Sequence, residues 1–94
     1  MEELAFRSAM VCQMLGNTTR YRILKLLAKK PMTPGQLRQV LAKPPAVISN
    51  HLAKLKYAGL VRFKREPGGL MYWPKPKGVG RLIAGLERFA SQMM

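Results

Sequence analysis

Several residue types on which protein chemistry depends are scarce in this chain of 94 residues. It has one cysteine, Cys12, one histidine, His51, and no aspartate. A single thiol excludes an internal disulfide and a zinc cluster built from several cysteines of one chain. The sequence also lacks a glycine-rich phosphate loop and a pair of carboxylates placed beside a nucleophile. We therefore expect neither an enzymatic activity nor a cofactor.

Long apolar runs are also missing, and acidic residues are few. The apolar stretch at 9–15 is too short to span a membrane, and Glu2 and Glu3 stand where a signal peptide would carry positive charge. Four acidic residues against 17 Lys and Arg give a formal net charge of +13. Such an excess favours a polyanionic partner, because each phosphate that is neutralised releases bound counterions. We expect a cytoplasmic, nucleoid-associated protein whose leading partner is nucleic acid and which binds no membrane.

What is present is a series of helical patterns in a length that suits one domain, residues 1–94. Apolar residues at helical spacing predict a first helix over about 3–15, closed by Gly16. Asn17 is a favourable N-cap for a second helix, which stops before Pro31.

Two short helices joined by a tight turn follow, over about 33–57. Thr33 and Gln36 have the spacing of a capping box, with proline at the first helical position. Pro44 and Pro45 end the first of these helices and force the turn. The residues expected to point inward are Leu37, Val40 and Leu41, then Ile48, Leu52 and Leu55. Such a pair is the helix-turn-helix pattern.

A β-hairpin is expected over about 60–73, because two β-rich runs flank a turn sequence at 66–69. A lysine-bearing linker leads from it to an amphipathic C-terminal helix over about 78–94. The predicted fold class is mostly α with a small β-hairpin, in the order four helices, two strands and one helix. The hairpin would be the wing of a winged helix-turn-helix.

Three segments carry a resemblance to a known family: LGNTTRYRIL at 15–24, ISNHL at 48–52 and AGLV at 58–61. They resemble the winged helix-turn-helix core of the arsenic-repressor (ArsR/SmtB) family of bacterial and archaeal transcriptional regulators, over roughly two-thirds of the chain. The resemblance implies the wing and a homodimer formed by the first and last helices. The predicted dimer contacts are Leu4, Met10, Leu82, Leu86 and Phe89.

The chain departs from the metal-sensing members of that family. Those members carry a Cys-x-Cys pair at the start of the third helix, or His and acidic ligands along the last. Here the first place reads Met32, Thr33 and Pro34, and the last helix has Glu87 but neither His nor Asp. Too few nitrogen and sulfur donors remain for a site of the family's kind. We expect no bound metal, and the sequence names no effector.

The helix at 45–57 is expected to enter the major groove. Its face opposite the apolar stripe carries Ala46, Ser49, Asn50 and Ala53, of which only Ser49 and Asn50 can hydrogen-bond to bases. Pro44 and Pro45 remove two backbone donors, so the helix start should read bases poorly. The predicted DNA-binding residues are Pro45, Ala46, Ser49, Asn50, His51, Ala53, Lys54, Lys56, Lys64 and Arg65. The alternative for this face is an ordinary solvent-exposed helix surface.

Other features have two interpretations each. The lysines and arginine of the predicted set either contact phosphates or form a generic charged face. His51 is expected to pack beside the wing, with a direct DNA contact as the alternative. Phe63, Tyr72 and Trp73 favour hairpin and core packing over a base-stacking platform. Cys12 is expected to be a buried structural thiol, with a redox-sensitive disulfide across the dimer as the alternative.

The function that fits these features is a dimeric transcriptional repressor that binds operator DNA. An architectural, chromatin-like protein with little sequence preference is the first alternative, because the charge is high and the reading face is sparse. A winged-helix adaptor that binds another protein is the second, and the charge makes it less attractive.

Overall fold

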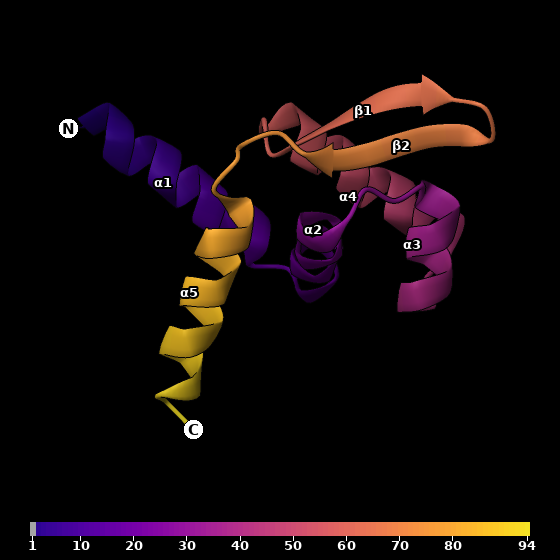
Figure 1. Cartoon of the computed structure of the whole chain (residues 1–94). Helices are drawn as coiled ribbons and strands as arrows, with labels where there is room; N and C mark the ends of the chain where they lie inside the picture. Colours follow the sequence, from indigo (N-terminus) through magenta and orange to yellow (C-terminus); the bar gives the residue numbers. More distant parts are fainter. Residues whose placement is uncertain (1) are drawn as a thin grey trace.

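The computed structural model describes residues 2–94 and forms five helices and one two-stranded antiparallel sheet in that part of the chain (Figure 1). The elements are α1 (Glu2–Leu15), α2 (Thr18–Lys29), α3 (Pro34–Leu41), α4 (Pro45–Tyr57), β1 (Val61–Glu66), β2 (Gly69–Pro74) and α5 (Val79–Ser91). This order confirms the predicted fold class. None of the helices within 2–94 is long and apolar enough to cross a membrane.

Local capping determines where α2 and α3 begin. The side-chain oxygen of Asn17 accepts a hydrogen bond from the backbone N–H of Arg20 at 2.9 Å. The Thr33 hydroxyl accepts from the Gln36 N–H at 3.1 Å, and the Gln36 side chain accepts from the Thr33 N–H at 2.9 Å. All three bonds satisfy backbone N–H groups at the helix starts that no intrahelical acceptor reaches, as the sequence predicted.

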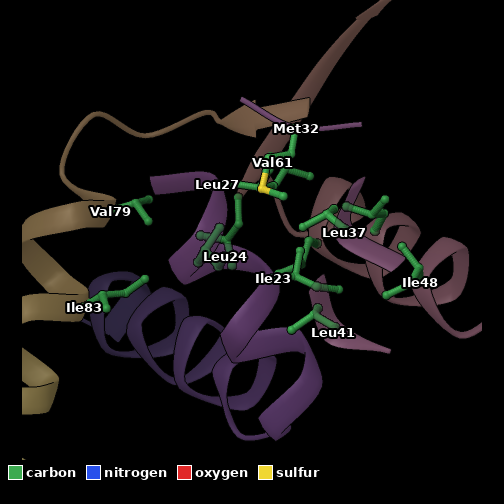
Figure 2. Packing of buried hydrophobic residues seen from close by; sticks show 13 residues of the cluster. Ile23, Leu24, Leu27, Met32, Leu37, Leu41, Ile48, Val61, Val79 and Ile83 are labelled. Carbon is green, nitrogen blue, oxygen red and sulfur yellow. The ribbon is translucent and has the colours of Figure 1, made fainter. Parts of the chain in front are cut away.

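The core forms around α2, whose Ile23, Leu24 and Leu27 are almost completely buried (Figure 2). All the other members of the cluster come from later elements: Met32, Leu37, Leu41, Ile48, Leu52, Leu55, Leu60, Val61, Val79 and Ile83. Val40 was expected inside but is 54% exposed. Leu37 and Leu41 are four residues apart and share one face of the short helix α3, so Val40 is turned to the side.

The hairpin pairs β1 with β2 in a register that places Phe63 opposite Tyr72. Pro67 and Gly68 form its turn, and Gly69 is the first residue of β2. Gly68 and Gly69 have φ angles of 98° and 133°, a region that glycine enters without steric cost. Beyond the predicted hairpin, Met32 exchanges two backbone hydrogen bonds with Tyr72, at 2.9 and 3.1 Å. This contact attaches the wing to the segment between α2 and α3.

Helices α1 and α5 extend from the same side of the body (Figure 1). No residue of α1 is buried, and in α5 only Val79 and Ile83 are. Of the predicted dimer contacts, Met10 is half-buried, and four are exposed apolar side chains: Leu4, Leu82, Leu86 and Phe89. A single chain therefore leaves much of the apolar surface of both helices in contact with solvent.

Candidate DNA-binding surface

Helix α4 is held to the body by one apolar stripe. Ile48, Leu52 and Leu55 are at most 2% exposed and fall one helical turn apart. Pro44 occupies the N-cap without a side-chain hydrogen bond, and Pro45 is the first helical residue, where a missing N–H costs nothing. The stripe and the two prolines together determine which face of the helix points outward.

The outward face is the one that the sequence predicted. It consists of Ala46, Ser49, Asn50 and Ala53, all exposed. Within residues 2–94 the side chains of Ser49 and Asn50 donate and accept no side-chain hydrogen bond. The amide of Asn50 keeps both its donor and its acceptor for an outside partner, and this pair matches the N6 and N7 atoms of adenine.

His51 lies at the edge of this face, and its neighbour is α2 instead of the wing. The Nη1 atom of Arg20 is 3.4 Å from His51 Nδ1. Burial is the main cause that lowers the pKa of His51 below its ordinary value, and the positive charges of Arg20, Lys54 and Lys43 add to it. The expectation of packing beside the wing was therefore wrong in its partner, while half-burial of the ring agrees with a structural role.

Basic side chains lie on α4 and on the neighbouring strand β1. Lys54 is exposed on the helix itself. The Lys56 ammonium lies 4.4 Å from the ring centroid of Phe63, and this cation–π contact connects α4 with β1. Lys64 and Arg65 are exposed on β1. Because successive strand residues point to opposite faces, these two side chains do not reach the same side of the wing.

The aromatic residues of the hairpin pack against one another and against cations. The Phe63 and Tyr72 rings have centroids 5.3 Å apart, and the Arg62 guanidinium lies 5.6 Å from the Trp73 centroid. These contacts confirm the prediction of hairpin packing.

Arg20 is the site residue that sequence reasoning missed. It is only 8% exposed, and its Nε–H donates to the Met14 carbonyl at 2.6 Å. Arg20 belongs to the segment at 15–24 that resembles the family. Helical periodicity treats an arginine as a surface residue, so its burial cannot be recognised from the sequence pattern. Lys43, in the turn before α4, was also missed as a contributor to the positive field around His51.

Side chains that could bind a metal ion do not cluster in the part of the chain that the structure describes. Among residues 2–94, no three His, Cys, Asp or Glu side chains are placed to hold a metal ion. Cys12 is exposed, so the expectation of a buried thiol is wrong for the single chain. It lies beside apolar residues of α5, in a hollow lined also by Leu82 and Leu86.

A small helical body with one outward polar helix and a hairpin beside it defines the winged helix-turn-helix class of DNA-binding proteins. Comparison with known proteins agrees with this class. Residues 17–62 match the family described as "Bacterial regulatory protein, arsR family". The chain belongs to the ArsR family of winged helix-turn-helix transcriptional regulators. This membership confirms the resemblance that the sequence predicted and the expectation of a transcriptional regulator.

Individual relatives differ in how much of their length is shared. The HTH-type transcriptional regulator KmtR of Mycobacterium tuberculosis is 36% identical over 73 residues, which cover 78% of this chain and 56% of KmtR. The chain thus spans little more than half of that relative. Reduced HlyU from Vibrio cholerae has a TM-score of 0.86 at 27% identity, over 95% of this chain and 94% of HlyU. The homodimeric winged helix-turn-helix domain of Mb0332 from Mycobacterium bovis has a TM-score of 0.85 at 28% identity, over 97% and 84%.

Proposed function

We propose that this chain is a homodimeric transcriptional repressor that occupies operator DNA with α4 in the major groove and the hairpin on the flanking backbone. The observation that carries the proposal is the outward face of α4. Ser49 and Asn50 are exposed there on a helix whose opposite face is buried, in a chain of net charge +13. Free hydrogen-bonding groups on a rigid helix suit base reading, and the charge suits the phosphates.

Exposed apolar residues on α1 and α5 support the homodimer. Leu4 is 67% exposed, Phe89 is 65% exposed, and both lie on helices that project from the body. The Mb0332 domain, similar in fold and 28% identical, is described as homodimeric. A two-fold dimer would set two copies of α4 about one DNA turn apart, roughly 34 Å, and the operator would then be a pseudo-palindrome.

The sign of regulation and the independence from metal are further parts of the proposal. HlyU is named a transcriptional activator, so a reporter assay must decide whether occupancy represses. Release from DNA is proposed to need no metal, because the described residues gather no ligand set. A DNA partner also implies a cytoplasmic, nucleoid-associated location.

The test is a pair of fluorescence-anisotropy titrations, one against a candidate operator and one against random duplex, each at several salt concentrations. We expect a preference for the operator of about a thousandfold, near the lower end for specific binders, because few side chains read bases. Both affinities should fall steeply with salt, because phosphate contacts dominate them. Equal affinities for the two duplexes at every salt concentration would contradict operator recognition.

An architectural, chromatin-like protein is the second candidate, and the composition of the reading face favours it. Two of the four outward residues on that face, Ala46 and Ala53, offer only a methyl group. If operator and random duplex bind alike while the salt dependence stays steep, this candidate replaces the first.

A further inference from the structure

The outer side of α2 carries a surface groove that is distinct from the outward face of α4 and that reaches α5 at Glu87. Two hollows, of about 410 and 300 Å³, adjoin one another, because both are lined by Leu26, Lys29 and Val40. We call them together the α2–α3 groove. Its apolar floor is Leu26 and Val40, and its basic rim is Arg22, Lys25, Lys29 and Lys30.

The floor and the rim are both incompletely satisfied by the chain itself. Val40 is 54% exposed, and Leu26 is only partly buried. Lys25 pairs with Glu87 at 2.8 Å, but within residues 2–94 no carboxylate lies within 4.0 Å of the other three rim cations. An exposed apolar strip bordered by four cations, with Glu87 as the one carboxylate paired to them, suits a ligand that brings both apolar and acidic groups.

The groove faces away from α4, the helix that carries the candidate DNA-binding face. The buried face of α2 carries Arg20, which contacts His51 of α4. Arg22 and Lys29 lie on the opposite side of the same helix, because two residues advance it by about 200° and nine residues by about 180°. Duplex DNA seated on α4 and the hairpin therefore leaves the groove accessible.

We propose that the α2–α3 groove docks an acidic peptide segment of another protein, with apolar side chains on Leu26 and Val40 and carboxylates beside the rim cations. The face of α2 that borders the groove, from Tyr21 to Lys29, is about 12 Å long at the rise of an α-helix. That length accommodates two to three turns of an amphipathic helix. A sugar-phosphate backbone satisfies the cations but buries no apolar surface, so the exposed floor favours a peptide over nucleic acid.

The test uses the full chain and a fluorescently labelled synthetic peptide of about 12 residues, in which glutamates surround leucines at helical spacing. A second peptide has the same charges with serine in place of leucine. The variants are Val40→Ser, which removes an apolar group from the floor, and Lys29→Glu, which reverses one rim charge. Lys77→Glu, in the exposed linker after the hairpin, is the charge-matched control. Circular dichroism checks that each variant is folded.

We expect saturable binding of the leucine peptide and a loss of about tenfold in affinity for both Val40→Ser and Lys29→Glu. Lys77→Glu should change peptide affinity by less than about twofold, and Val40→Ser should leave the affinity for duplex DNA unchanged. The proposal is overturned by absence of binding, by equal binding of the serine peptide, or by equal losses in Lys29→Glu and Lys77→Glu. Displacement of the peptide by duplex DNA also overturns it, because the groove would then belong to the nucleic-acid surface.

Discussion

The guanidinium of Arg20 and the imidazole of His51 meet across the contact between α2 and α4, with Nη1 3.4 Å from Nδ1. A guanidinium can only donate, so Nδ1 must accept, and the proton of the neutral imidazole resides on Nε2. The same guanidinium donates to the Met14 carbonyl at the end of α1. One buried side chain of α2 therefore joins α1, α2 and α4.

Replacing Arg20 with leucine should destabilise the protein by about 2 kcal/mol. The change removes a charge-assisted hydrogen bond and leaves the Met14 carbonyl without its donor. Urea denaturation measures the effect, with the exposed Arg22→Leu as the matched control, for which we expect a change within about 0.5 kcal/mol. Equal stability of the two variants would show that Arg20 holds nothing in place.

Stability should fall as the pH drops below the ordinary imidazole pKa of about 6.5. Burial and the neighbouring cations lower the pKa of His51 in the folded state, so the unfolded chain takes up this proton first. The free energy of unfolding is therefore unaffected by His51 above that pH, declines below it, and levels once the folded ring is protonated too. Thermal melts of wild type and His51→Gln over about pH 5 to 8 test this, since the variant should lose part of the decline. If wild type and His51→Gln showed the same dependence of stability on pH, the decline could not be assigned to His51.

Ala42 ends α3 in the left-handed region, with φ 54° and ψ 46°. A β-carbon is unfavourable there, so Ala42→Gly should stabilise the protein by about 1 kcal/mol. Ala53→Gly, in the interior of α4, is the matched control and should destabilise by a similar amount. Differential scanning calorimetry should thus record shifts in Tm of opposite sign, and shifts of the same sign would contradict the assigned turn.

Leu86→Asp or Phe89→Asp should convert the proposed dimer to a monomer at micromolar concentration. Each change places a charge on the exposed apolar side of α5, where burial against a partner would leave it unpaired. Val40→Asp makes the same change at an exposed apolar residue of α3, outside α1 and α5, and we expect this variant to stay dimeric. Sedimentation velocity distinguishes the two states. A wild type that sediments as a monomer, with both α5 changes harmless, would rule the dimer out.

Asn50→Ala and Lys64→Ala should separate sequence reading from phosphate binding. The first removes a base-edge contact and should cost about 1 to 3 kcal/mol on the preferred operator and little on random DNA. The second should weaken binding to every duplex alike and reduce the salt slope by about one unit. Competition assays with the preferred operator and with random duplex measure both effects. If Asn50→Ala weakens both equally, α4 is not reading bases.

The sequence by itself determined the features that depend on short-range chemistry. Asn17 and the Thr33 capping box mark where two helices begin, because an oxygen three residues before a free N–H is enough to cap it. The stripe of Ile48, Leu52 and Leu55 determined which face of α4 is buried, and hence that Asn50 is exposed.

Only the tertiary structure decided which distant residues meet. Arg20 and His51 are 31 positions apart, and no local signal in the sequence indicates their contact. Helical periodicity also assigns a charged residue to the surface. The bridge from Met32 to Tyr72 is made by backbone N–H and C=O groups, which every residue except proline carries. The side chains at these two positions therefore do not indicate it. Val40 was placed inside because it is apolar, but α3 packs on one side only, and this left Val40 in the open groove beside α2.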